Sequence, residues 1–302
     1  MTFDFTHAVA VPFRMQPGLR KLAAGSPQLT PTAPGSAHLL AKRQVLQTDW
    51  AHALLCAPGF DATPALTALA AHAAREHPRA WAVAANGDWH APALGLRVGP
   101  DGDCHGDALL SALPAPWRRA ALLALAFEED FAIVDGAGAT LPWLAVCLPS
   151  HWRPTDKIGR HFSEIHAPVA DNALLQAAGP RLFKLVCGPD TWERFVWNVS
   201  RYRTLDAHPD RVHAPPWPAD APAHAWWRTE RQTFIPLPHL QQAVFTIRVQ
   251  TQPLADALAT PAQAQRLHDA IASMSPAVLA YRSLAAPRNA LLAWLAERAA
   301  AA

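Results

Sequence analysis

The sequence lacks the short motifs that mark several large classes of enzyme. It contains no Gly-x-Gly-x-x-Gly fingerprint, no phosphate-binding loop, no Gly-x-Ser-x-Gly and no His-Glu-x-x-His. Those motifs serve dinucleotide binding, nucleotide hydrolysis, serine hydrolases and zinc proteases. No internal repeat is visible either. The absences argue against all of these classes.

Cysteine is also scarce and scattered. The four cysteines, Cys56, Cys104, Cys147 and Cys187, lie 40 or more residues apart. No Cys-x-x-Cys pair is therefore present to bind zinc or an iron–sulfur cluster. We expect four isolated, buried thiols.

Charged residues make up only 17% of the chain, and 26 Lys and Arg against 24 Asp and Glu leave a net charge of +2. With no polybasic tract, this balance argues against nucleic acid or an anionic membrane as a partner. The first residues carry Asp4 where a secretion signal would be basic, and no apolar run approaches the length that spans a bilayer. We expect a soluble, cytoplasmic protein.

Hydrophobic residues are abundant, at 51% of 302 residues, and can form a substantial core in one large domain or two smaller ones. The chain has 29 Pro, 12 Trp and 15 His but only 2 Tyr. Histidine is so frequent that most of these residues need no functional explanation.

The most informative stretch runs from Leu148 to Val169. Pro154, Thr155 and Asp156 can begin a helix, and Pro168 disfavours helical geometry at the residue before it, so we predict a helix from about Thr155 to His166. Ile158, Phe162, Ile165 and His166 then share one apolar face. A histidine at the end of a helix can face a cavity and bind haem iron, although a hydrogen-bonded core histidine is the common alternative.

A second stretch has an unusual pattern for a strand. Arg228, Glu230 and Gln232 alternate with Thr229, Arg231 and Thr233 in the strand expected at 226–234, so both faces are polar. Either one face lines a polar cavity or the strand lies exposed at the edge of a sheet.

Other elements follow from periodicity and turn residues. We expect an irregular arm over 1–37, packing helices from Ser36, over 64–75 and over 117–127, short strands at 81–84 and 94–98, and a strand over 193–202. The acids Glu128, Glu129 and Asp130 are expected in a solvated turn. Residues 206–225 form a long loop with three histidines, typical of a lid or binding loop, and two helices are expected after Pro261. Residues 180–186 fit either a helix or a strand.

Several motifs, with their order and spacing, resemble the alpha subunit of haem-dependent oxidative N-demethylase and its bacterial relatives. They are Pro12-Phe13-Arg14-Met15 with Gly18-Leu19, Glu129-Asp130-Phe131, Leu148-Pro149-Ser150-x-Trp152, Lys157-Ile158-Gly159-Arg160, Ile165-His166-Ala167-Pro168-Val169, Arg228-x-Glu230-Arg231-Gln232-Thr233 with Leu237-Pro238, and Phe245-Thr246-Ile247-Arg248.

The resemblance implies an α+β protein with a PAS-like antiparallel sheet around a haem pocket and added helices at both termini. It implies a single domain over 1–302, with an arm and helices in 1–78, the PAS-like core in 79–252 and helices in 253–302. It also implies a subunit that binds haem b and oxidises dimethylamine or a similar small amine with O2. Separate subunits would supply electrons from NADPH through flavin and an iron–sulfur centre.

The resemblance also implies site residues. His166 would be the proximal iron ligand, and Lys157, Arg160 and Arg231 would pair with the haem propionates. Glu230, with Arg228 beside it, would be the catalytic group that holds a protonated amine, although a salt bridge from Glu230 to Arg228 or Arg248 is an equal alternative.

One departure concerns the strand after the haem helix. Relatives tend to have Arg-x-Asn-Trp there, and this chain has Arg194-Phe195-Val196-Trp197-Asn198. The substrate could therefore differ. A non-enzymatic haem- or small-ligand-binding PAS-type sensor, or a chain that has lost the cofactor, are the alternative functions.

Overall fold

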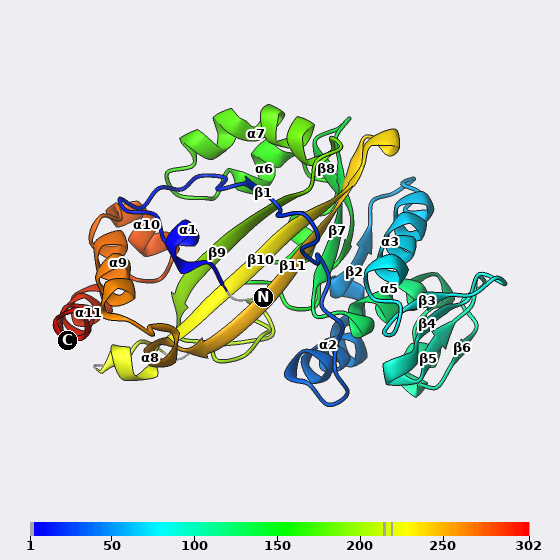
Figure 1. Cartoon of the computed structure of the whole chain (residues 1–302), viewed down its shortest axis with the longest axis horizontal. Coiled ribbons are helices and arrows are strands. Elements are labelled where there is room, and N and C mark those ends of the chain that lie inside the picture. The colour runs from blue at the N-terminus through cyan, green and yellow to red at the C-terminus, as the bar shows by residue number, and fades with distance from the viewer. Residues whose placement is uncertain (1–2, 214–215, 219, 302) are drawn as a thin grey trace.

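A computed structural model describes residues 3–213, 216–218 and 220–301. In this part of the chain a seven-stranded antiparallel sheet has the order β1-β9-β10-β11-β7-β8-β2, and a four-stranded sheet has the order β3-β4-β5-β6. The large sheet crosses the middle of the molecule (Figure 1). Its strands are β1 (Arg20–Lys21), β2 (Leu54–Cys56), β7 (Asp130–Asp135), β8 (Thr140–Ala145), β9 (Trp192–Ser200), β10 (Trp226–Leu237) and β11 (Gln242–Pro253).

The small sheet lies at one end of the molecule, beside the helices that come before and after it in the sequence (Figure 1). Its strands are β3 (Ala82–Val83), β4 (Trp89–Ala91), β5 (Leu96–Val98) and β6 (Cys104–His105). The neighbouring helices are α2 (Ala37–Ala53), α3 (Thr63–Glu76), α4 (Ala108–Ala112) and α5 (Ala115–Ala126). A turn joins β3 to β4, with the Gly87 amide donating to the Ala84 carbonyl at 2.9 Å, and β4 was not predicted from the sequence.

The predicted helix starts reflect local chemistry. Ser36 caps α2 by accepting a hydrogen bond from the Leu39 amide, and Pro64 occupies the first turn of α3. The buried side of α5 carries Leu122, Leu123 and Leu125, all fully buried. Burial of side chains of this size stabilises the fold by about 1.5–3 kcal/mol each.

The other end of the molecule is formed by helices α8 (Leu254–Ala257), α9 (Pro261–Ala272), α10 (Pro276–Tyr281) and α11 (Arg288–Ala300) (Figure 1). They share a hydrophobic core with Trp197 of β9 and Trp227 of β10, whose rings stack with centroids 5.1 Å apart. Two helices were predicted here. After Pro261 the described residues form three, α9, α10 and α11, because the chain turns sharply between α10 and α11, with Ser283 at φ 57°.

The helix predicted from Thr155 to His166 ends as expected but begins too early. The structure has a 3-10 turn η2 (Pro154–Asp156), and helix α6 (Phe162–His166) starts only at Phe162. Gly159 interrupts them with φ 68°, and its amide donates to the Leu141 carbonyl at 2.8 Å. The β7–β8 hairpin thus takes hydrogen bonds that a continuous helix would have needed.

Other differences are smaller. Residues 180–186 belong to helix α7 (Ala173–Val186) despite Pro180, and the arm over 1–37 contains α1 (Phe5–Ala8) and β1. The prediction of four buried thiols was wrong in part: all four are free, but Cys147 alone among them is buried and Cys56 is exposed.

The predicted solvated turn at 128–130 was also wrong. Glu129 and Asp130 are each 1% exposed. The buried ammonium of Lys42 lies 3.2 Å from an Asp130 carboxylate oxygen and donates to the Phe127 carbonyl at 3.0 Å. This buried cation, distant in sequence, allows acids to lie in the core.

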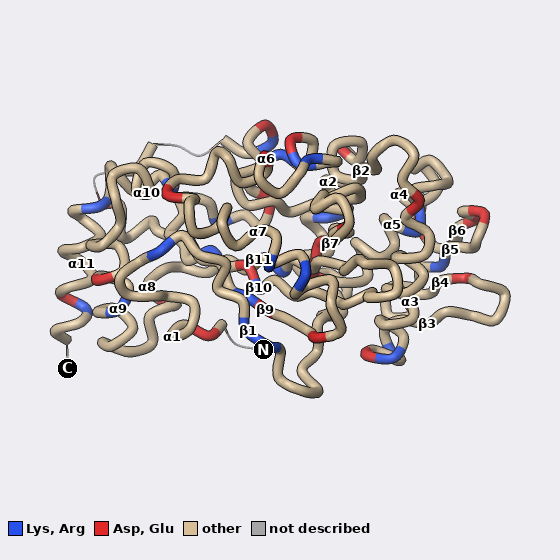
Figure 2. The backbone as a smooth tube through the Cα atoms, turned by 90° about the horizontal axis from the view of Figure 1, so that it is seen from above, with Lys and Arg blue, Asp and Glu red and all other residues tan. Residues whose placement is uncertain are grey.

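Strand β10 lies between β9 and β11 and is therefore not an edge strand. Glu230 is opposite Val196 of β9 and Val249 of β11. Charged residues of both signs are interspersed along the molecule, including its central strands (Figure 2). The antiparallel sheet and the added terminal helices are confirmed, and the likeness to a PAS domain stays a prediction. In the part of the chain that the structure describes, no helix has the length and apolar character needed to cross a membrane.

Candidate functional site

The main cavity lies between the central strands and the pair of helices α6 and α7. It has a volume of about 410 Å³ and is lined by β9, β10, β11, α6, α7, the segment 150–152 and residues 281–282. Figure 1 shows α6 and α7 above this side of the sheet. A volume of this size is typical of sites for small molecules and cofactors.

His166 forms part of the cavity wall at the end of α6. Its Nδ1 lies 2.9 Å from the Phe162 carbonyl and donates to it, which fixes the tautomer and leaves the lone pair of Nε2 free. Burial lowers the pKa of His166 to about 4, so the ring is neutral at pH 7. A buried neutral imidazole with a carbonyl behind Nδ1 is suited to bind a metal through Nε2.

Two side chains hold the end of α6 in place. Lys157 Nζ donates to the Ile165 carbonyl at 2.8 Å, and Asn172 Nδ2 donates to the His166 carbonyl at 2.8 Å. Both satisfy carbonyls that the short helix leaves free. Lys157 also lines the cavity, and burial lowers the pKa of its ammonium.

Glu230 lies on the sheet side of the cavity and is 7% exposed. Its Oε2 accepts a hydrogen bond from Gln232 Nε2 at 2.6 Å. Glu230 forms neither of the two salt bridges considered as alternatives. Arg248 Nε donates to Glu128 at 2.6 Å, and Arg228 donates to Ser150 and to backbone carbonyls. Glu230 is therefore available to a positively charged ligand.

Arg228 is 2% exposed and acts as a clamp. Its guanidinium donates to Ser150 Oγ at 2.8 Å and to the carbonyls of Pro149, Thr204 and Leu205 at 3.3, 2.9 and 2.7 Å. Burial lowers its pKa to about 10, so it remains charged at pH 7. Because protein atoms take these donors, Arg228 positions two segments of the cavity wall.

Two residues of β9 that were not predicted as site residues face the main cavity without partners. Arg194 lies opposite Gln232, and Asn198 lies opposite Arg228. In the described part of the chain, the buried Arg194 Nε and Asn198 Oδ1 make no hydrogen bond. Alternation along the predicted strand could have placed both on the Glu230 face. Because both residues line the cavity, these two atoms can hydrogen-bond to a molecule bound there.

His151 is another cavity residue that the sequence did not single out. Its backbone has φ 66°, in a region that favours glycine, and its ring lies 4.9 Å from that of Tyr202. Burial, with smaller contributions from Arg228 and Arg201, lowers the pKa of His151 to about 4. A strained backbone that places a neutral histidine in a cavity is typical of a functional position.

A side cavity of about 250 Å³ adjoins the main cavity. His151, Asn198 and Arg282 line both. Arg282 lies just after α10, and its guanidinium is over the Trp197 ring at 4.5 Å and the Phe13 ring at 4.9 Å. Only the tertiary structure brings this residue, from the C-terminal helices, to the site.

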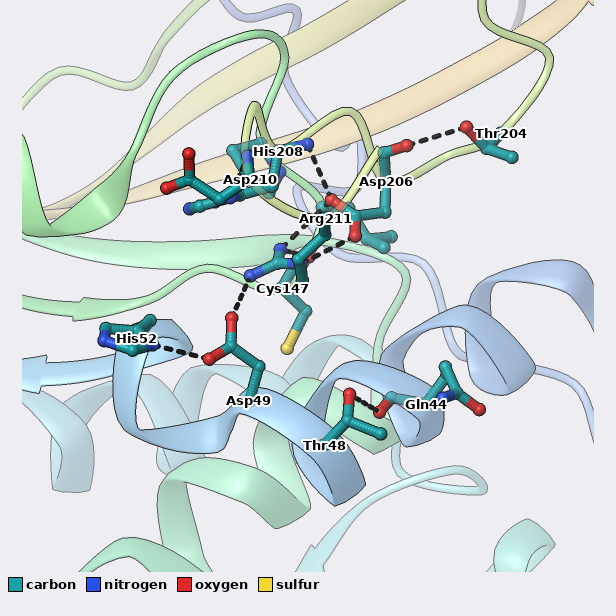
Figure 3. Close-up of polar contacts among 12 residues, drawn as sticks. Gln44, Thr48, Asp49, His52, Cys147, Thr204, Asp206, His208, Asp210 and Arg211 are labelled. Carbon is teal, nitrogen blue, oxygen red and sulfur yellow. Dashed lines mark hydrogen bonds and ion pairs between the residues drawn. The ribbon is translucent and has the colours of Figure 1, made fainter. Parts of the chain in front are cut away.

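The first part of the long loop is fixed to the rest of the protein. Arg211 donates to Asp206 through Nε and to Asp49 of α2 through Nη1, both at 2.8 Å, and to the Cys147 carbonyl at 2.9 Å (Figure 3). Ion pairs and hydrogen bonds from one half-buried guanidinium thus connect three segments.

The same loop positions His151. The Ala207 amide donates to the Pro149 carbonyl and the His151 amide donates to the Ala207 carbonyl, both at 3.1 Å. Ala207, Pro209 and Trp217 of the loop line the side cavity. Part of the loop therefore lies in a cavity wall, and its role as a lid or binding loop stays a prediction.

Two predicted cofactor residues lie away from the main cavity. Arg160 is 60% exposed in its side chain and pairs with Glu164 at 3.5 Å. Arg231 points to the opposite face of β10, where its Nε donates to Glu193 at 3.1 Å. The turn at Gly159 directs the Arg160 side chain outward. Side chains alternate between the two faces of a strand, so Arg231 lies on the face opposite to Glu230.

The fold and the site together define an α+β protein with a cavity that combines a neutral histidine, a carboxylate and cationic groups that have no acidic partner among the described residues. The family model described as haem-dependent oxidative N-demethylase, alpha subunit-like, matches residues 37–292. The chain belongs to this family, whose description names haem as the cofactor and oxidation as the chemistry. No curated protein matches the chain.

Proposed function

We propose that the chain is the haem-binding subunit of an oxidative N-demethylase, with a PAS-like core, that acts on a small methylated amine. The observation that carries the proposal is His166 at the cavity wall, with Nδ1 donating to the Phe162 carbonyl and Nε2 free. The family match supplies the haem context.

The residues around the main cavity fit a haem. His166 would bind the iron, and apolar side chains including Val134, Leu141 and Phe245 would pack on the ring. Arg194, whose buried Nε has no partner in the described residues, and Lys157 would hold the propionates. Both cations lie close enough to His166 to lower its pKa, after the larger effect of burial.

The other residues bind and orient the substrate. Bound haem b supplies the activation of O2 and the oxidation of an N-methyl group. Glu230 attracts the protonated amine and holds its nitrogen, and Gln232 orients the Glu230 carboxylate. Arg228 keeps the segment with His151 in place, and the apolar walls exclude water. Electrons would come from a separate NADPH-linked reductase that carries flavin and an iron–sulfur centre.

A haem titration tests the proposal. The wild-type chain is expected to develop a Soret band at one haem per chain, and His166→Ala to bind haem at least 100-fold more weakly. The matched control is His161→Asn, because His161 caps the same helix and asparagine can replace that cap. Absence of a Soret band in the wild type, or an equal loss in both variants, would contradict the proposal.

Catalysis has its own test, which also separates the enzyme from a haem sensor. With a reductase of this class, the wild type is expected to oxidise NADPH in an amine-dependent manner and to release formaldehyde. Haem binding without turnover of any methylated amine would support the sensor.

A further inference from the structure

The boundary between the main cavity and the side cavity has an excess of positive charge. Arg282 lines both cavities. Among the residues that the structure describes, those around the side cavity include no aspartate or glutamate. An electropositive, partly apolar chamber of this kind favours an anionic group.

Arg282 has no acidic partner in the described part of the chain. Its Nη2 donates to the Trp197 carbonyl, its Nε is buried without a partner, and its plane lies over two aromatic rings. Burial lowers its pKa to about 10, which leaves it charged at pH 7. A buried, oriented guanidinium without a counter-ion is ready to bind a carboxylate.

Glu230 and Arg282 line the same cavity. Arg282 contacts the backbone at Trp197, one residue from Val196, which is opposite Glu230. Tyr281, next to Arg282, also lines the main cavity. A positive and a negative binding group therefore face the same space.

The haem propionates would lie at the other end of β9. Arg194 and Asn198 are four residues apart, which corresponds to about 13 Å along a strand. Propionates occupy one edge of a haem, so a pair held by Arg194 and Lys157 near His166 leaves Arg282 unpaired.

We propose that the substrate is a small zwitterion, an N-methylated amino acid, with its ammonium group at Glu230 and its carboxylate at Arg282. This inference rests on the proposed function. Asn198 Oδ1, which is buried and without a partner in the described residues, accepts a hydrogen bond from the substrate or from a water that it retains. The side cavity accommodates the carboxylate end.

Calorimetry on the haem-loaded full chain tests the proposal with three probes. N,N-dimethylglycine carries the carboxylate, N,N-dimethylethanolamine replaces it with a neutral hydroxyl, and dimethylamine lacks both. We expect N,N-dimethylglycine to bind at least tenfold more tightly than the other two. Equal or weaker binding of N,N-dimethylglycine overturns the proposal.

The variant Arg282→Gln locates the effect. It is expected to weaken binding of N,N-dimethylglycine at least tenfold and to leave N,N-dimethylethanolamine and haem affinity unchanged. Arg298→Gln is the matched control, because Arg298 also lies over a tryptophan ring, at 4.9 Å, and donates to a carbonyl. If Arg282→Gln lowers haem affinity and leaves the preference among probes intact, the anion at Arg282 is a propionate and the proposal fails. If the variant does not fold, the three-probe comparison on the wild type decides.

The haem titration distinguishes this inference from the proposed function. Without a Soret band the proposed function fails, while calorimetry on the haem-free chain still measures the preference for N,N-dimethylglycine over N,N-dimethylethanolamine. With a Soret band and no such preference, the substrate proposal alone fails.

Discussion

The two faces of β9 and β10 contain similar residues but treat their charges differently. On the face away from the main cavity, Arg231 pairs with Glu193 at 3.1 Å, and Arg20 pairs with the same carboxylate at 2.9 Å. On the cavity face, Arg194 and Glu230 have no ion-pair partner in the described residues. In the described residues, the charges of one face thus form ion pairs within the chain, and those lining the cavity on the other face do not.

The difference separates structural charges from charges that await a ligand. Buried charges are stable only when they are paired or hydrogen-bonded. A buried charge with a partner in the chain is thus accounted for by the fold, whereas a buried charge without one indicates that a ligand binds there. Variants on neighbouring residues of β9 test this distinction directly.

The largest effect is expected on the paired face. Glu193→Ala leaves the 6% exposed Arg231 without its carboxylate, which should lower the free energy of unfolding by about 3–5 kcal/mol. Urea denaturation of the haem-free chain measures this. Asp190→Ala, at an exposed ion pair with Lys21, is the control and should change stability by less than about 1 kcal/mol. If Glu193→Ala also changes stability by less than about 1 kcal/mol, the ion pairs on this face are not structural, and the proposed difference between the two faces is wrong.

On the cavity face, Glu230→Gln keeps the size of the side chain and removes its charge. The affinity for a protonated methylamine should fall roughly 10- to 100-fold, because a charge-assisted hydrogen bond contributes about 1.5–3 kcal/mol. Haem affinity should not change, and the haem-free chain should be at least as stable as the wild type. Ligand titration followed by calorimetry checks this, and a loss of haem instead would assign Glu230 to the cofactor.

Arg194→Met replaces an unpaired cation next to Glu193 in the sequence. Haem should bind about tenfold more weakly, because one propionate loses its partner. The haem-free chain should be at least as stable as the wild type, since a buried guanidinium without a partner is removed. A loss of stability comparable to that of Glu193→Ala would show that Arg194 is structural.

The smallest effect concerns Glu129, a buried acid outside both faces. Burial raises its pKa to about 7 from an ordinary value of 4.5. A raised pKa means that the folded state holds the proton, so this contribution to stability is full below pH 4.5 and is lost as the pH rises through 7. Glu129→Gln should remove this fall in stability across that range. Thermal denaturation of the wild type and the variant between pH 4.5 and 8 measures this fall. If the stability of Glu129→Gln falls with pH as steeply as that of the wild type, the prediction is wrong.

Local sequence was sufficient to predict much of the frame. Pro168 set the end of α6 at His166, Ser36 set the start of α2, and strands were predicted at β9 and β10. The start of α6 was missed because Gly159 and Phe162 donate to the β7–β8 hairpin, a partner that no local pattern reveals.

The site was predicted in part for the same reason. Alternation placed Glu230 and Arg228 together, and the same rule separates Arg231 from them. Alternation along β9 could also have placed Arg194 and Asn198 on the face of Glu230. His151 had none, because its position depends on hydrogen bonds to Ala207, and Arg282 reaches the cavity only through the packing of the C-terminal helices.

The sequence by itself determined the family, the polar strand and the histidine at a helix end, because motifs, alternation and helix termination are local properties. Only the tertiary structure decided which charges have partners. Pairing depends on distances between residues far apart in the chain, such as Arg231 and Glu193 or Arg282 and Trp197. The chemistry of the cavity follows from the charges that remain unpaired.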